Sequence, residues 1–137
     1  MHTADLCLHA MKLRIIVADD NQKMLDQIVL LLRAHFDVIA TATDGTAALE
    51  CIQRYKPDVA VLDVVMPRMN GIELTRELSR NGHSTHVVIC SVENDRETID
   101  TARAAGALGY VFKPRMVRDL TTAVKSVAAG HPFTSAE

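Results

Sequence analysis

The sequence contains no tryptophan, and aromatic residues of all kinds make up only 4% of its 137 residues. This leaves little surface on which bases or sugars could stack. Its formal net charge is −2, whereas domains dedicated to nucleic acids or membrane surfaces are usually basic. We therefore expect a protein with no direct nucleic-acid contact and no membrane association.

Cysteine is also scarce, and its spacing excludes two common uses. Cys7, Cys51 and Cys90 are too far apart in sequence for a metal knuckle or a redox pair. Their odd number argues against a disulfide framework, so we expect reduced thiols in a cytoplasmic protein. Cys90 lies within an apolar run, where a small buried residue is its expected role.

No apolar stretch approaches the length of about 20 residues that a membrane-spanning helix needs. Residues 1–10 lack the basic start and continuous apolar centre of a signal peptide. We expect residues 1–10 to form an N-terminal extension, residues 11–130 a single domain, and residues 131–137 a C-terminal tail or the start of a linker. A domain of this length can bury a sizeable core without disulfides or metals.

What the chain has is a regular alternation of short apolar runs and longer amphipathic ones. The apolar runs, expected to be strands, cover residues 13–18, 36–41, 58–62, 87–90 and 110–112. Each is followed by apolar residues at three- and four-residue steps, which is typical of a helix. The fourth helix is expected at residues 93–104. In the last helix the apolar residues are Val117, Leu120, Val124 and Val127. Strict alternation predicts an α/β fold: a doubly wound, five-stranded parallel sheet with five helices.

Polar residues follow the apolar runs at the positions where strands should end. They are Asp19, Asp20, Asp63, Ser91 and Lys113. The carboxyl ends of parallel strands lie along one edge of the sheet, where ligands bind. We therefore expect three carboxylates, a hydroxyl and an ammonium group to share one pocket.

This combination of groups suits phosphoryl chemistry. Three neighbouring carboxylates repel one another and need a cation, and oxygen ligands of this kind favour Mg²⁺. A metal ion and Lys113 together would attract an anion, and a phosphoryl group fits this role. Asp63 would act as the nucleophile and form an aspartyl phosphate, and Ser91 would donate a hydrogen bond to the phosphoryl oxygens.

Each of these residues also has a simpler interpretation when taken alone. Asp19, Asp20 or Asn21 could cap a helix, and Ser91 could do the same. Asp63 could be a turn residue and Lys113 a solvated lysine. The joint pattern favours the site, because agreement among independent features is the stronger evidence.

Four segments carry a resemblance to a known family. They are IIVADD (15–20), VLDVVMPRMNG (61–71), VVICS (87–91) and GYVFKP (109–114). With them, residues 12–130 resemble the bacterial two-component response-regulator receiver domain, a flavodoxin-like fold with strand order 2-1-3-4-5. The chain is chemotaxis-regulator-like and closest in style to receivers that precede a C-terminal helix-turn-helix.

The resemblance implies a role for each residue of the site. Asp20, Asp63 and the backbone carbonyl of Val65 would bind Mg²⁺ directly, and Asp19 would act through a metal-bound water. Asp63 would accept the phosphoryl group from the phosphohistidine of a sensor histidine kinase or a histidine phosphotransfer protein. Lys113 would pair with that group. The domain would catalyse only its own phosphorylation and dephosphorylation, and so would not be an enzyme.

The resemblance also implies a switch. Ser91 would reorient toward the phosphoryl group, and Tyr110 would move from an exposed to a buried position, although a packed core tyrosine is the alternative. The Lys113–Pro114 bond would be cis. Residues 93–129 would form the output face, which would control a downstream protein partner and could also support a homodimer.

Two valines depart from the pattern of the family. Many relatives carry a polar residue at Val65 and a smaller one at Val92, so we expect both to shield the acyl phosphate and slow its hydrolysis.

A haloacid-dehalogenase-type phosphatase would need a second aspartate where Val65 stands. A flavin-binding relative would need a Ser/Thr/Gly-rich loop where Asp19 and Asp20 stand. The remaining alternative is the receiver fragment of a DNA-binding transcriptional regulator whose helix-turn-helix domain is absent from these residues.

Overall fold

The sheet of this protein is parallel throughout. The structure is a computed structural model that describes residues 12–135, so the expected N-terminal extension lies outside the described residues. The strands are β1 (Arg14–Ala18), β2 (Asp37–Ala42), β3 (Val59–Leu62), β4 (His86–Ser91), β5 (Gly109–Phe112) and β6 (Phe133–Thr134). Their spatial order is β2-β1-β3-β4-β5-β6. The doubly wound α/β fold and the order of its first five strands are confirmed, and β6 extends the sheet beyond them.

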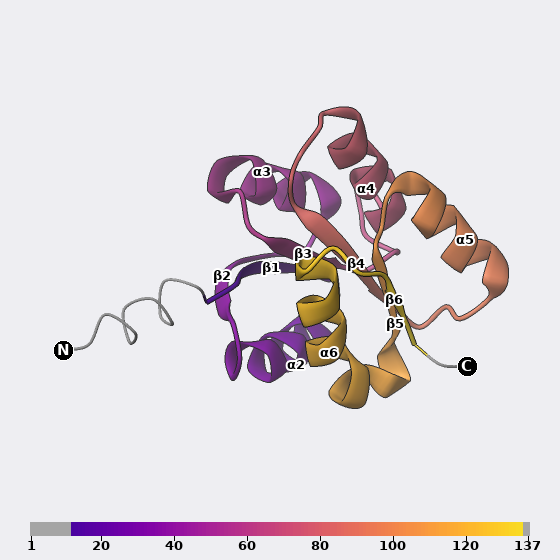
Figure 1. Cartoon of the computed structure of the whole chain (residues 1–137). Helices are drawn as coiled ribbons and strands as arrows, with labels where there is room; N and C mark the ends of the chain where they lie inside the picture. Colours follow the sequence, from indigo (N-terminus) through magenta and orange to yellow (C-terminus); the bar gives the residue numbers. More distant parts are fainter. Residues whose placement is uncertain (1–11, 136–137) are drawn as a thin grey trace.

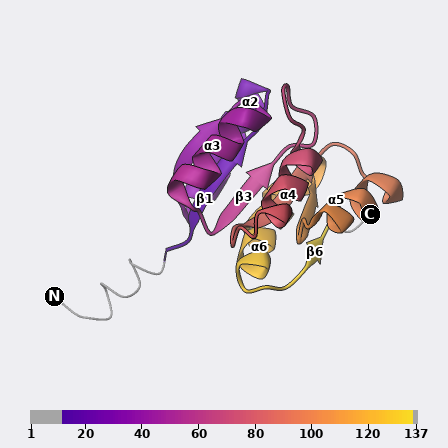
Figure 2. The same cartoon turned by 90° about the horizontal axis from the view of Figure 1, so that it is seen from above.

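Within residues 12–135, five α-helices cover the two faces of the sheet, as predicted. They are α2 (Gln22–Arg33), α3 (Gly45–Tyr55), α4 (Gly71–Arg80), α5 (Arg96–Ala105) and α6 (Met116–Ala128), and a short 3₁₀ helix, η1 (Lys113–Arg115), precedes α6. Helices α3, α4 and α5 lie on one face, and α2 and α6 lie on the other (Figures 1 and 2). No helix in residues 12–135 is long and apolar enough to cross a membrane.

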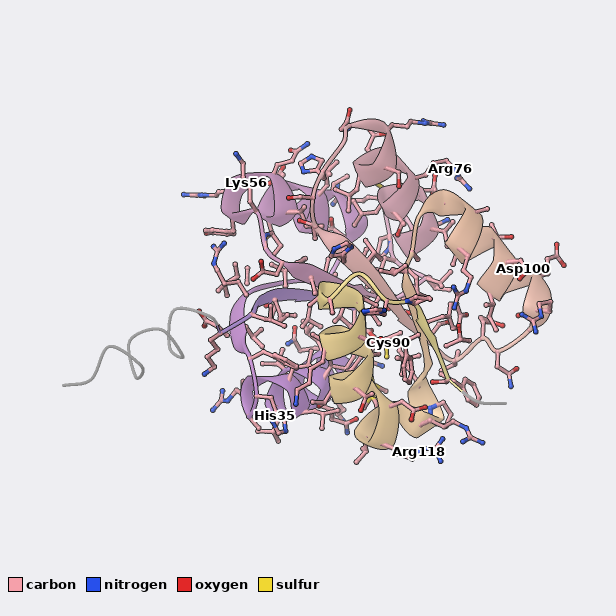
Figure 3. The ribbon with its side chains drawn as sticks, in the orientation of Figure 1. His35, Lys56, Arg76, Cys90, Asp100 and Arg118 are labelled. Carbon is pink, nitrogen blue, oxygen red and sulfur yellow. The ribbon has the colours of Figure 1, made fainter. Side chains whose placement is uncertain are left out.

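The strands divide the interior into two apolar cores because successive side chains point to opposite faces. Val59 and Val61 pack toward α2 and α6, whereas Ala60 and Leu62 pack toward α3, α4 and α5. All four residues of β3 are buried, which explains why this segment is an unbroken apolar run. Cys90 is buried in the first core, between the sheet and α6 (Figure 3).

Helix α5 begins later than the sequence pattern indicates. The predicted helix starts at residue 93, but the observed one starts at Arg96. The Asp95 side chain accepts a hydrogen bond from the Thr98 amide at 3.0 Å and so caps the helix there. The backbone of Glu93 is consequently free to bind two side chains of the site, as described below.

Two further expectations are wrong. No cis peptide bond occurs in residues 12–135, so the Lys113–Pro114 bond is trans. Pro114 lies in the first turn of η1, where its fixed φ suits a helix start. Val117 does not join the apolar stripe of α6, because its side chain is 79% exposed and the neighbouring Met116 is buried instead.

Candidate functional site

The site forms where β1 and β3 end side by side. Ala18 pairs with Leu62, so the next residues, Asp19 and Asp63, emerge together at the carboxyl edge of the sheet. The Asp63 amide donates to the Ala18 carbonyl at 3.0 Å, and the Asp19 amide donates to the Ala42 carbonyl at 3.1 Å. The backbone of both aspartates is therefore fixed by the sheet itself.

The helix cap next to this edge is Asn21, which leaves the two aspartates available. The Asn21 side chain accepts a hydrogen bond from the Met24 amide at 3.0 Å and caps α2. One oxygen of Asp19, Oδ1, accepts from the Asn21 amide at 2.9 Å. Asp20 is exposed to solvent. Of the three candidate caps, Asn21 is therefore the residue that caps α2, and Asp19 and Asp20 are not.

Three carboxylates and one ammonium group meet at the site. Asp19, Asp20 and Asp63 each place a carboxylate oxygen within 4.8 Å of the others. Lys113 Nζ lies 2.8 Å from Asp19 Oδ2 and 3.3 Å from Asp63 Oδ2, and the lysine side chain is almost fully buried. Hard oxygen donors in such a cluster fit Mg²⁺. The buried Asp19 Oδ2 has no donor other than this ammonium group within the described residues.

The charges at the site are strongly coupled. Burial raises the pKa of Asp63, the Asp19 carboxylate reinforces the rise, and the Lys113 charge opposes it. Burial also disfavours the charged form of Lys113, but its hydrogen bond to Asp19 and the charge of Asp63 outweigh burial and raise the pKa of Lys113. Lys113 is therefore charged at neutral pH, and it partly neutralises two acidic groups that would otherwise repel each other.

The loop after Asp63 is held against the site by two glycines. A Cβ on Gly71 would lie 2.0 Å from the Asp63 carbonyl oxygen, and a Cβ on Gly45 would lie 1.8 Å from the Met69 carbonyl oxygen. A Cβ at either position would collide with the backbone of this loop, so the loop would have to shift, and both positions favour glycine. Sequence reasoning missed Gly45, for which the available signal was a glycine at a helix start directly after a capping Asp44.

Ser91 and Tyr110 meet at the backbone of Glu93. The Ser91 hydroxyl accepts a hydrogen bond from the Glu93 amide at 3.0 Å, and the Tyr110 hydroxyl donates to the Glu93 carbonyl at 2.7 Å. Both side chains are 1% exposed. Burial raises the pKa of Tyr110, and a hydrogen bond with Ser91 opposes the rise. Tyr110 is thus buried in this structure, and its role in a switch stays a prediction.

The two valines that depart from the family pattern are both on the surface. The Val65 and Val92 side chains are 63% and 62% exposed. Val65 is two residues beyond Asp63, and Val92 directly follows Ser91. The shielding of the acyl phosphate by these valines and the metal-binding role of the Val65 carbonyl stay predictions.

A parallel doubly wound sheet with clustered carboxylates and a lysine at its carboxyl edge defines an α/β domain whose ligand site lies at that edge. Residues 15–125 match the family model described as the response regulator receiver domain. The chain belongs to this family, and it is a receiver domain of a two-component response regulator.

Named relatives agree with this assignment. The chain is 34% identical over 124 residues to the transcriptional regulatory protein DegU of Brevibacillus brevis, covering 89% of this chain and 52% of DegU. It is 30% identical over 114 residues to the chemotaxis protein CheY of Halobacterium salinarum, covering 83% of this chain and 95% of CheY. It therefore spans about half of the first relative and nearly all of the second.

A solved structure agrees as well. The signal receiver domain of the response regulator NarL from Mycobacterium tuberculosis superposes with a TM-score of 0.84 at 31% identity. The match covers 88% of this chain and 98% of that domain. The similarity thus extends over most of this chain and nearly all of that domain.

Proposed function

We propose that Asp63 accepts a phosphoryl group in a Mg²⁺-dependent reaction. The observation that carries this proposal is the position of Asp63 Oδ2, 3.3 Å from the Lys113 ammonium and within the three-carboxylate cluster. An Asp63 oxygen would attack the phosphorus atom, forming an O–P bond as the bond from phosphorus to the donor breaks. The donor would be the phosphohistidine of a sensor histidine kinase or a histidine phosphotransfer protein.

The remaining residues of the site have supporting roles. Asp19, Asp20, Asp63 and the Val65 carbonyl would hold Mg²⁺, which would neutralise charge on the transferred group. Lys113 would exchange its ion pair with Asp63 for the phosphoryl oxygens of the product. The domain would act only on itself, catalysing its own phosphorylation and dephosphorylation.

The proposed response to phosphorylation is a shift between two arrangements of Ser91 and Tyr110. Both side chains are hydrogen-bonded to Glu93, which lies between β4 and α5. If Ser91 turned toward a phosphoryl group, its hydrogen bond with the Glu93 amide would be lost and the loop between β4 and α5 could change its conformation. Such a change would bias the face formed by α5, β5 and α6. This face would bind a downstream protein partner or a second copy of the chain.

The phosphoryl donor would dock on the surface next to η1. Leu30 on α2 and Val117 on α6 are 67% and 79% exposed, and a shallow groove is lined by Gln27, Leu30, Leu31, Met116 and Val117. Exposed large apolar side chains in a group favour a protein contact. Because Val117 follows Lys113 by four residues, a partner bound here would lie close to the site.

The test is incubation with acetyl phosphate, with and without Mg²⁺, followed by intact mass spectrometry. Wild-type protein should gain one phosphoryl group only with Mg²⁺, and Asp63→Asn should gain none. Asp37→Asn, at an exposed position on β2, serves as the matched control and should behave as wild type. Equal labelling of wild type and Asp63→Asn would refute the proposal.

A second candidate function is control of a DNA-binding unit in the same polypeptide. The observation in its favour is that the chain matches about half of DegU, a transcriptional regulatory protein. An antibody against this domain, used on extracts of the source cells, distinguishes the two. A band at the size of 137 residues would favour the separate receiver, and a band of about twice that size would favour the fused regulator.

A further inference from the structure

The segment after α6 is bound along the free edge of β5 (Figure 1). Gly109 pairs with Phe133 and Tyr110 with Thr134 in a parallel ladder. The Phe133 amide donates to the Leu108 carbonyl at 3.2 Å. The Phe133 side chain packs against the core between the sheet and α6. Strand β6 is therefore anchored both by its backbone and by an apolar side chain.

The ladder continues past β6 through a side chain. The Ser135 amide donates to the Tyr110 carbonyl at 2.9 Å. The Phe112 amide then donates to the Ser135 hydroxyl oxygen at 3.0 Å. This hydroxyl occupies the position in which a longer β6 would have placed a backbone carbonyl. Ser135 thereby holds the last amide of β5, one residue before Lys113.

The hydroxyl of Ser135 is fixed in turn by Asp119 on α6. It donates to Asp119 Oδ2 at 2.9 Å, and both residues are only 8% exposed. Arg118, on the exposed side of α6 (Figure 3), donates from Nε to Asp119 Oδ1 at 3.1 Å. Burial disfavours the charged carboxylate, but hydrogen bonds from Arg118 and Ser135 outweigh it and lower the pKa of Asp119. Asp119 is therefore an ionised acceptor at neutral pH.

We propose that Ser135 and Asp119 are positioning residues for Lys113, and that they couple the segment after α6 to the phosphoryl-accepting site. The chain of contacts runs from Asp119 through the Ser135 hydroxyl to the Phe112 amide, and from there along the backbone to Lys113. Lys113 must place its ammonium between Asp19 and Asp63. A fixed backbone at the end of β5 would therefore fix the position of this ammonium group.

The coupling acts in both directions, because a free energy shared between two sites is reciprocal. Displacement of β6 by a partner would loosen Lys113 and slow phosphorylation. Conversely, movement of Lys113 toward a phosphoryl group would change the hydrogen bond between the Phe112 amide and the Ser135 hydroxyl. The inference rests on the proposed function for its role in phosphorylation, but the position of Lys113 is measurable without any phosphoryl group.

The test compares Ser135→Ala, Ser135→Thr and Asp119→Asn in the full chain with Ser84→Ala, an exposed serine elsewhere on the molecule, as control. The first readout is the NMR signal of the Lys113 side-chain ammonium in the unphosphorylated protein. The second is the rate of phosphorylation by acetyl phosphate, separated into maximal rate and half-saturating concentration. Thermal unfolding of each variant shows that it is folded at the assay temperature.

Ser135→Ala and Asp119→Asn should shift or broaden the Lys113 signal and lower the maximal rate by roughly three- to tenfold, the effect of one lost hydrogen bond. The half-saturating concentration should stay unchanged. Ser135→Thr keeps the hydroxyl and should restore both readouts, and Ser84→Ala should match wild type.

A wild-type Lys113 signal in Ser135→Ala, or a Ser135→Thr variant as impaired as Ser135→Ala, would overturn the inference. If wild type takes up no phosphoryl group, the proposed function fails, and the Lys113 signal alone decides the inference.

Discussion

Replacing Lys113 with methionine is expected to destabilise the folded protein strongly at neutral pH in the absence of Mg²⁺. The ammonium lies 2.8 Å from Asp19 Oδ2 and 3.3 Å from Asp63 Oδ2. Its loss leaves two buried carboxylates facing each other with no cation between them. Removing one partner of a buried ion pair typically costs about 3–5 kcal/mol. For a domain of this size that corresponds to a fall in melting temperature of roughly 10–20 °C.

The cost of this substitution should depend on pH. Burial raises the pKa of Asp63 in the folded protein, and Lys113 opposes the rise, so the pKa should be higher still in Lys113→Met. A carboxyl group with a raised pKa contributes stability below its unfolded-state pKa and loses it as pH rises through the folded-state pKa. The loss of stability in the variant should therefore be smallest at pH values below the ordinary pKa of an aspartic acid and should grow as the pH rises above it.

The assay is urea unfolding of both proteins over a series of pH values without divalent ions. Lys125→Met, at an exposed position of α6, controls for the loss of one positive charge and should change the free energy of unfolding by no more than about 0.5 kcal/mol. Mg²⁺ should stabilise Lys113→Met more than wild type, because it would replace the missing cation. A cost below about 1 kcal/mol at neutral pH, the level of a surface ion pair, or a cost independent of pH, would refute the reasoning.

Three further predictions concern the same edge of the sheet. Val65→Asn should speed the loss of the phosphoryl group, measured by intact mass over time, and an unchanged rate would argue against shielding by this side chain. Asp20→Asn should leave the melting temperature without Mg²⁺ near that of wild type, because Asp20 is exposed. In a thermal-shift titration the variant should bind Mg²⁺ roughly tenfold or more weakly than wild type. Equal Mg²⁺ affinity of the two proteins would exclude Asp20 as a ligand. Gly71→Ala should destabilise the fold by about 1–3 kcal/mol, because its Cβ would lie 2.0 Å from the Asp63 carbonyl oxygen. The control Gly82→Ala places its Cβ near no atom within 4 Å and should add only the strain of its positive φ. Equal losses of unfolding free energy for the two variants in chemical denaturation would contradict the prediction.

The sheet and most of the site could be predicted from the sequence because their signals are local. A strand buried on both faces is an uninterrupted apolar run, as residues 59–62 are. Polar residues that follow such runs, including Asp19 and Asp63, must lie at the carboxyl edge of a parallel sheet. The same rule places Lys113 at this edge, since β5 belongs to the same sheet.

Features that depend on tertiary contacts could not be predicted in this way. Strand β6 has two residues and no alternating pattern, and its attachment depends on the link between Ser135 and Asp119, which are 16 positions apart. On α6, Met116 and Val117 fit an apolar stripe about equally well by spacing. Packing against the sheet decides in favour of Met116. The start of α5 depended on which of several acidic residues caps the helix, and Asp95 does so.

The most direct test of the central claim identifies which aspartate carries the phosphoryl group. Protein phosphorylated with acetyl phosphate and Mg²⁺ is reduced with borohydride, which converts an aspartyl phosphate to homoserine, and its peptides are sequenced by mass spectrometry. The account predicts homoserine at position 63 and unmodified aspartate at positions 19 and 20. Homoserine at position 19 or 20, or a phosphoryl group that leaves no homoserine at position 63, would contradict it.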